Sequence, residues 1–346
     1  MPIRSSLIFA SATALLLVAA LLAVSNGTLE ITPAQTWDAL QKGLTGQPLE
    51  GLAAIVWNLR LPRVVFAVLV GTALAMSGVA MQGVFQNPLA DPYLVGVASG
   101  AAFGATVAIF ASSSAASGFV PALFTAQAAG SGLVPLFAFF GALGAVSLTL
   151  VLSSTAKGSP HAFILSGVIV GSMITAVTTF IQLFDADRLR AVFSWTLGNL
   201  SLAGWSEVLA VLPVAVLGFV ALLFLAKPLD ALQLGEDTAQ TLGIRVLHLK
   251  IAVIVAASLM TAAAVSFAGI IGFVGLVAPH IMRRLLGASH RPLLLASGLA
   301  GSSLLLLSDL GARILIRPQE LPVGIITTLL GGPFFLWFMR TGRKNA

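Results

Sequence analysis

The chain has 346 residues, of which 58% are hydrophobic and only 9% are charged, whereas a soluble domain carries about 25% charged residues. This composition excludes most soluble folds, and the mean hydropathy of +1.02 is typical of a chain that folds in a lipid bilayer. The formal net charge of +6 does not indicate nucleic-acid binding, because so few charges between apolar runs cannot form a basic stripe that follows phosphates.

Apolar segments recur along the chain at the length that crosses a bilayer, about 20 residues in a helix. The first follows a basic start at Arg4; a cleaved secretory signal begins in the same way, but the run is long enough for a retained span. The predicted spans are 7–24, 61–84, 93–112, the broken region 119–128 with 133–154, 162–184, 207–226, 249–268, 270–282, 291–308 and 321–339. The sequence therefore predicts an all-α polytopic membrane protein with about ten transmembrane helices and one transmembrane domain over residues 1–346.

Glycine and proline mark the places where these helices break or pack closely. Gly269, Gly272, Gly275 and Pro279 interrupt the short segment 270–282 and predict a broken or re-entrant helix, which is tolerated only where protein or a water-filled path surrounds it. Small residues spaced four apart let helix backbones approach closely in lipid; the chain has them at Gly71 with Ala75, at Gly96, Gly100 and Gly104, and at Gly167 with Gly171.

Basic residues indicate how the chain is oriented, because Lys and Arg accumulate in short cytoplasmic loops. The tail is therefore predicted to be cytoplasmic, and counting back through the spans places the N-terminus there too. The basic residues predicted inside are Arg4, Lys157, Lys227, Arg245, Lys250, Arg283, Arg284, Arg291, Arg340, Arg343 and Lys344. Those predicted outside are Lys42, Arg60, Arg63, Arg188, Arg190, Arg313 and Arg317. The outer arginines exceed what orientation requires and need a separate explanation.

The sequence lacks the groups that membrane enzymes use. It contains no Gly-Lys pair, which a phosphate-binding loop requires, no His-Glu-x-x-His zinc motif and no cysteine. Among the carboxylates only Asp309 lies near a helix body, and Arg313 follows it at the spacing of an i,i+4 ion pair. We expect no enzyme activity, cofactor or metal site. A secondary transporter driven by an ion gradient remains the alternative, because Asp309 offers an ionisable group.

Three stretches resemble one family. Residues 59–63 read LRLPR, and residues 78–96 read GVAMQGVFQNPLADPYLVG; residues 269–287 read GIIGFVGLVAPHIMRRLLG; and residues 309–333 begin with DLGAR, continue through ELPVG and end in LGGP. These blocks, and nearly the whole chain, resemble the FecCD-type permeases, the membrane subunits of binding-protein-dependent ABC importers for iron–siderophore complexes, haem and cobalamin. The resemblance implies a type II ABC importer permease architecture in the bacterial cytoplasmic membrane.

The resemblance also implies partners. In this family two identical or similar permeases pair around a central pathway, two ATPase subunits bind the cytoplasmic face, and a periplasmic or lipid-anchored substrate-binding protein delivers the cargo. Arginines at the positions of Arg60, Arg63 and Arg313 meet glutamates of that protein, and Arg317 lies one turn further on. Opposed charges of this kind steer docking. The alternative is that these arginines reach lipid headgroups or pair with Asp309 and Glu320.

The segment 228–246 resembles the cytoplasmic coupling segment of the family, which sits in a groove of the ATPase. Acidic residues favour the N-terminus of a helix, and a glycine suits a left-handed C-terminal cap. The residues expected to carry coupling are Leu234, Gly235, Glu236, Asp237, Ala239, Leu242 and Gly243. A plain cytoplasmic linker is the alternative, but a linker does not need two turns bounded by glycine.

Hydroxyl side chains mark the fifth span, which lines the pathway in the family. They are Ser166, Ser172, Thr175, Thr178 and Thr179. Weak, non-ionic contacts suit a passage that must release a bulky chelate, although such side chains also bond to their own backbone or to a neighbouring helix. We predict a homodimeric transport subunit that moves an iron–siderophore, haem or corrinoid complex by ATP-driven alternating access, and the chain itself does not specify which of these.

Overall fold

The computed structural model describes residues 2–27, 31–111, 132–154 and 160–342. Within these ranges the chain is helical and contains no β-strand. Its elements are α1 (Pro2–Ser25), α2 (Pro33–Leu44), α3 (Leu52–Ile55), the π-helical turn η1 (Val56–Arg60), α4 (Leu61–Phe85), the 3-10 turn η2 (Pro92–Val95), α5 (Val97–Ala111), α7 (Leu133–Ser154), α8 (Pro160–Gln182), α9 (Ala186–Thr196), α10 (Trp205–Leu232), α11 (Glu236–Thr241), α12 (Val246–Ala268), α13 (Val274–Leu286), α14 (His290–Ile314) and α15 (Val323–Gly342).

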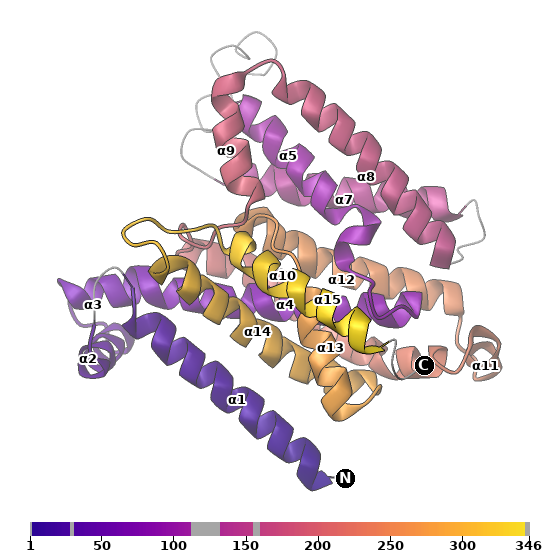
Figure 1. The fold of residues 1–346 in the computed structure, drawn as a ribbon, viewed down its shortest axis with the longest axis horizontal. Coiled ribbons are helices and arrows are strands. Elements are labelled where there is room, and N and C mark those ends of the chain that lie inside the picture. Colours follow the sequence, from indigo (N-terminus) through magenta and orange to yellow (C-terminus); the bar gives the residue numbers. More distant parts are fainter. Residues whose placement is uncertain (1, 28–30, 112–131, 155–159, 343–346) are drawn as a thin grey trace.

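The helices form two groups that lie side by side (Figure 1). One contains α5, α7, α8 and α9, and the other is built around α4 with α10, α12, α13 and α14 packed against it. The start of α1, the short helix α11 and the end of α15 lie toward the lower right, whereas α2, α3 and the end of α14 lie to the left. The start of α1, the end of α15 and helix α11 therefore lie on the same side of the molecule.

Most of the predicted spans are present as long apolar helices. Seven helical segments in the described ranges are long and apolar enough to cross a membrane, and two further apolar helices, within α5 and α15, are shorter. The predicted span 270–282 corresponds to α13, which has 13 residues and contains Pro279. The predicted segment 119–128 lies outside the described residues. The prediction of an all-α polytopic membrane protein is confirmed.

The predicted break near Gly269 is confirmed. Helix α12 ends at Ala268, residues 269–273 are not helical, and α13 begins at Val274. Gly269 has φ +71° and Phe273 has φ +68°, a backbone region that disfavours any side chain other than hydrogen. The chain therefore changes direction between α12 and α13, at a break that lies within the protein interior.

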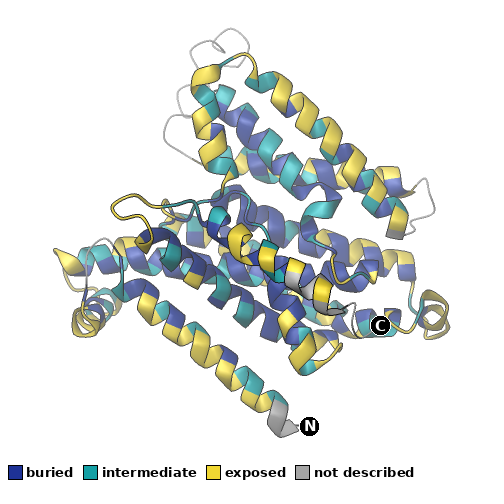
Figure 2. Cartoon of the chain, viewed as in Figure 1, coloured by how far each residue is buried: buried dark blue, intermediate teal, exposed yellow. Residues whose placement is uncertain are grey.

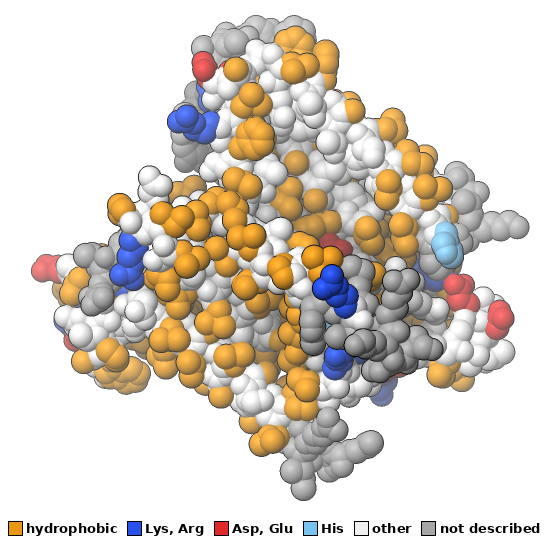
Figure 3. Space-filling model, viewed as in Figure 1, with side chains coloured by type: hydrophobic (Ala, Val, Ile, Leu, Met, Phe, Trp, Pro, Cys, Tyr) orange, Lys and Arg blue, Asp and Glu red, His pale blue; other side chains and the backbone are white. Residues whose placement is uncertain are grey.

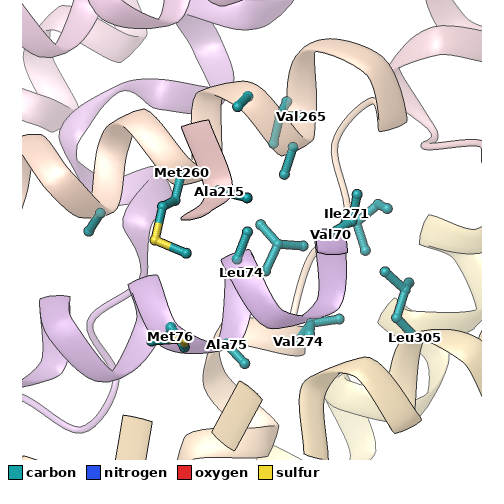
Figure 4. Packing of buried hydrophobic residues seen from close by; sticks show 14 of the residues in the cluster. Val70, Leu74, Ala75, Met76, Ala215, Met260, Val265, Ile271, Val274 and Leu305 are labelled. Carbon is teal, nitrogen blue, oxygen red and sulfur yellow. The ribbon is translucent and has the colours of Figure 1, made fainter. Parts of the chain in front are cut away.

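The core lies around α4. Of its apolar window 78% of the residues are buried, compared with 17% for α8, and Figure 2 shows the same contrast between the centre and the outer helices. Val70 and Leu74 of α4 lie in the same buried apolar cluster as Met260 of α12 and Leu305 of α14 (Figure 4). Hydrophobic side chains are spread over the face in Figure 3, and charged side chains are few and lie near its edges and lower right, as expected where lipid replaces water.

Close helix contacts depend on glycine. Gly78 of α4 lies directly against the backbone carbonyl of Gly275 in α13, so that even one methyl group on Gly78 would overlap it. Gly100 of α5 meets Gly141 of α7 in the same way. The predicted role of Gly100 in close packing is confirmed, and it follows the general pattern of small residues between membrane helices.

Candidate functional site

Charged side chains gather at two places, one at each end of α14. We call the first the arginine cluster: Arg60, Arg63, Asp309, Arg313 and Glu320. Arg63 Nη2 lies 2.8 Å from Asp309 Oδ1, and Arg63 Nη1 lies 2.9 Å from Glu320 Oε2. Arg313 Nε lies 3.2 Å from Asp309 Oδ2, so the predicted i,i+4 pair is present. Asp309 joins α4 to α14, and its side chain is only 2% exposed.

The other bonds of the cluster hold the end of α1. Arg60 Nη1 donates to the carbonyl oxygens of Val24 and Ser25 at 2.7 and 2.9 Å. Arg313 Nη1 donates to the carbonyl oxygens of Ala23 and Asn26, both at 3.1 Å. These carbonyls have no partner within α1, and a cation at a helix C-terminus also interacts favourably with the helix dipole. Arg60 and Arg313 therefore cap α1 from two other helices.

This geometry decides which of the predicted docking arginines a partner protein can reach. Arg60 and Arg313 are 7% and 4% exposed and turn toward α1. Arg63 is mostly buried between Asp309 and Glu320, whereas Arg317 is exposed in the loop that follows α14. Pairing with Asp309 and Glu320 thus accounts for Arg63 and Arg313, and Arg60 binds backbone carbonyls instead. An exposed docking surface at this place rests on Arg317 and the accessible edge of Arg63.

The second place is the coupling junction, where α10, α11 and α12 meet. Helix α11 begins after Gly235, which has φ +109°, and is followed by Gly243, with φ +82°. The two glycines that bound the predicted coupling segment are thus in left-handed backbone. Ala239 is buried, whereas Leu234 and Leu242 are 69% and 62% exposed. The short helix thus buries one small apolar residue, and the large apolar side chains that flank it are exposed.

Four charged or ionisable side chains hold the coupling junction together. Lys250 Nζ of α12 lies 2.7 Å from Glu236 Oε1 of α11. Asp230 Oδ1 of α10 accepts from the His290 backbone N–H at 2.7 Å and lies 2.8 Å from His290 Nδ1. Asp230 thereby places a carboxylate at the N-terminus of α14, where it interacts favourably with the helix dipole. No sequence motif indicates these pairs, because their members are far apart in the chain.

The predicted pathway residues on α8 only partly converge. Thr175, Thr178 and Thr179 line a pocket of about 220 Å³ with Ser99 of α5. The hydroxyl groups of Thr178 and Thr179 donate to the carbonyls of Ile174 and Thr175, at 2.8 and 2.9 Å. The remaining two predicted residues do not line this pocket; they are Ser166 and Ser172. A larger pocket of about 480 Å³ lies between α9, α10 and α12 and is lined by Trp195, Asn199 and Glu207, among others; no motif predicted it.

A further acid, half-buried by its accessible surface, lies between α4 and α5. Asp91 accepts from the Tyr93 backbone N–H at 2.8 Å, and Tyr93 Oη donates to the Ile271 carbonyl at 3.0 Å, next to the break before α13. Burial raises the pKa of Asp91 to about 6, and the hydrogen bond from the Tyr93 backbone lowers it in part. The Pro after Asp91 is a signal for a turn, but nothing in the sequence indicates that the acid is half-buried.

Comparison with known proteins decides the family. The FecCD transport family matches residues 15–341. The chain belongs to the FecCD transport family. It is 42% identical over 298 residues to the cobalamin import system permease protein BtuC of Halobacterium salinarum, with 86% of this chain and 76% of that protein covered. It is 38% identical over 296 residues to the hemin transport system permease protein HmuU of Yersinia pestis, with 84% of each covered.

Solved structures agree with this assignment. A metal-chelate type ABC transporter in an inward-facing conformation matches with a TM-score of 0.80 and 30% identity, covering 97% of this chain and 99% of that one. As a FecCD permease, the chain is a multi-pass membrane subunit of an ABC importer and not an enzyme. Its work requires an ATPase partner and a substrate-binding protein.

Proposed function

We propose that this permease forms a homodimer that imports a metal chelate or corrinoid, with the coupling junction facing the cytoplasm and the arginine cluster facing the opposite side. The match to FecCD permeases over residues 15–341 carries the proposal. The names of the relatives, a cobalamin and a hemin permease, support a cargo of the tetrapyrrole class, and an iron–siderophore complex is the next candidate.

The position of α11 supports its proposed contact with an ATPase. It stands at one end of the molecule, and acidic atoms lie at the right-hand edge of Figure 3, where α11 is found. Exposed leucines on both sides of a six-residue helix give a partner an apolar contact with acidic residues beside it, which is an arrangement that anchors an interface. A linker would gain nothing from exposing Leu234 and Leu242.

The proposed orientation follows from the same observation. The start of α1 and the end of α15 lie on the side of α11 (Figure 1). Arg340 near the end of α15 and Lys227 and Arg245 around α11 are the cations that the cytoplasmic side of a membrane protein collects. Both termini are therefore proposed to be cytoplasmic, and Arg317 with the edge of Arg63 to face the binding protein.

Reconstitution tests this function. The permease, its ATPase and its binding protein are placed in proteoliposomes, and uptake of cyanocobalamin, haemin and ferric hydroxamate is measured with and without ATP. We expect accumulation of one of these compounds that requires ATP and the binding protein. Uptake driven by a proton or sodium gradient without ATP would overturn the proposal. That mechanism is also disfavoured by Asp309, because two arginines already neutralise it.

A matched pair of leucine variants tests the ATPase contact. Leu242→Glu places a charge beside α11, and Leu202→Glu does the same at an exposed leucine near the start of α10. We expect the first to reduce copurification of the ATPase about tenfold, which corresponds to roughly 1.4 kcal/mol, and the second to leave it unchanged. Equal retention of the ATPase by both variants would count against α11 as the contact.

A further inference from the structure

Lys250 is a buried cation with one acidic partner. It lies in the first turns of α12 and is 2% exposed, and its Nζ is 2.7 Å from Glu236 Oε1. The carboxylate side of the pair is different, since the Glu236 side chain is 44% exposed. Lysine is almost never fully buried unless it is paired, so the position of Lys250 requires an explanation beyond packing.

The pair joins α12 to a helix that cannot stand alone. Helix α11 has six residues, and helices much shorter than about 12 residues are not stable in water without tertiary contacts. Its buried side chain is Ala239, which offers little apolar surface. The Lys250–Glu236 ion pair is therefore a main contact that fixes the direction of α11 relative to α12.

The neighbouring end of α10 is held in place by other residues. Asp230 binds the N-terminus of α14, and Gln86 Nε2 at the end of α4 donates to the Leu232 carbonyl at 2.8 Å. Helix α10 ends at Leu232. The chain then passes through Gly235, whose φ of +109° suits glycine. Helix α11 thus follows a glycine, whose backbone is the least restricted by sterics, and the first residue after it is Glu236. Whatever holds Glu236 sets the angle at which α11 leaves the bundle.

Other charges near α11 are placed differently. Asp237 and Arg245 are exposed, as charges on a partner-facing surface are, and Lys227 is exposed on α10. Lys250 points from α12 toward α11 from within the protein. Its position suits an internal connection and not a contact with the ATPase.

We propose that Lys250 is a positioning residue that makes α11 and α12 move as one unit, so that displacement of α11 by the ATPase reaches the far end of α12. That end is Ala268, where the chain breaks before α13 and lines the pocket of about 480 Å³. The inference rests on the proposed contact between α11 and the ATPase. Without the ion pair, α11 turns about Gly235 and α12 does not follow.

The absence of cysteine from the sequence provides a direct test. A single Ser194→Cys on α9, an exposed residue that lines the pocket of about 480 Å³ with Ala268, is labelled with a membrane-impermeant maleimide in the permease–ATPase complex, before and after trapping with ATP and vanadate. A spin label at Thr238→Cys reports the mobility of α11 in the same complex. ATP hydrolysis is measured in parallel, and the change in labelling is expressed per ATP hydrolysed.

For Lys250→Met we expect the trapping-dependent change in Ser194→Cys labelling per ATP to fall about tenfold, roughly 1.4 kcal/mol of lost coupling, and the label at residue 238 to become more mobile. Glu236→Gln removes the same pair from its exposed side and should have the same effect, which keeps the test valid if Lys250→Met folds poorly. The double exchange Lys250→Glu with Glu236→Lys restores the pair and should recover most of the response. Lys227→Met, which removes an exposed lysine, is the matched control.

The outcomes separate the inference from the proposed function. If the trapping-dependent change is absent in the wild-type complex, the proposed ATP-driven role is overturned and the inference falls with it. If the wild type responds and Lys250→Met and Glu236→Gln respond equally well, α11 does not act through Lys250, and the proposed function stands. Failure of the double exchange to restore a response that both single variants have lost would also contradict the ion-pair explanation.

Discussion

The arginine cluster and the coupling junction use the same kinds of side chain in different ways. In the cluster, the guanidinium groups of Arg63 and Arg313 share two carboxylates, and the central acid, Asp309, has a side chain that is 2% exposed. At the junction Lys250 and His290 each have one carboxylate partner, and those carboxylates are partly exposed: the Glu236 side chain is 44% exposed and that of Asp230 is 35% exposed. The comparison indicates that the cluster fixes helices to one another, whereas the junction can exchange its contacts with water or a partner.

The physical basis of this difference is desolvation. A charge buried with several partners is strongly destabilising when one partner is removed, because the others are left uncompensated. A pair with an exposed member is screened by water and contributes less. The two regions lie at opposite ends of α14, so substitutions in each can be compared on one helix.

The largest effect is expected at Asp309. Asp309→Asn removes the negative charge that Arg63 and Arg313 share, and it should lower the free energy of unfolding by about 3–5 kcal/mol. Thermal unfolding of the purified permease in detergent measures this. Asp38→Asn breaks an exposed pair with Lys42 and serves as the control, for which we expect a change below about 1 kcal/mol. A similar unfolding temperature for both variants would remove the distinction between buried and exposed clusters.

Asp91 and Asp309 allow a comparison of a half-buried acid that accepts from a backbone N–H with a buried acid that has arginine partners. Because burial raises the pKa of Asp91 to about 6, the folded protein keeps its proton at pH values where the unfolded chain has lost it. Stability from this group is therefore present below about pH 4 and is lost as the pH rises to about 6, by roughly 3 kcal/mol.

Asp91→Asn tests this pH dependence. The amide oxygen can still accept from the Tyr93 backbone, but it does not titrate. We expect the variant to match the wild type near pH 4 and to be more stable than the wild type above pH 6. Thermal unfolding of both proteins across this range, expressed as the difference between them, cancels the titration of the other carboxylates. A constant difference over the whole range would contradict the raised pKa of Asp91.

How far the sequence predicts the structure depends on whether a signal is local. Span length, the break at Gly269 and the glycine-bounded helix after Gly235 are local patterns of hydropathy and backbone freedom, and all three are present. The Asp309–Arg313 pair is also local and was predicted. The Arg63–Asp309 and Lys250–Glu236 pairs depend on which helices become neighbours, and the capping of α1 by Arg60 depends on how a distant helix ends. No spacing in the sequence carries that information.

An intermediate effect is expected at the junction end of α14. Asp230→Ala removes the acceptor for the His290 backbone N–H and the partner of His290 Nδ1. Because His290 is fully buried, its nitrogen loses a hydrogen bond without gaining water, and we expect a loss of about 1–3 kcal/mol. Thermal unfolding measures the loss, with Asp237→Ala on α11 as the exposed control. A loss as large as that of Asp309→Asn would contradict the view that the junction is the more loosely held region.

The smallest effect is expected at Glu320, the one exposed member of the arginine cluster. Its bond to Arg63 is short, at 2.9 Å, but its side chain is 31% exposed, so Glu320→Gln should lower stability by only about 0.2–1 kcal/mol. The difference between variant and wild type should shrink further as salt rises, because screening weakens exposed pairs. Glu320→Gln also leaves Arg63 Nη1 without its carboxylate partner, while Asp309 stays bound to the other side of the guanidinium. Association with the acidic surface proposed for the binding protein should therefore strengthen at low salt, since the two carboxylates compete for one guanidinium. Binding measured at low and high salt checks this, and weaker binding by the variant would show that Glu320 supports the docking surface instead of competing with it.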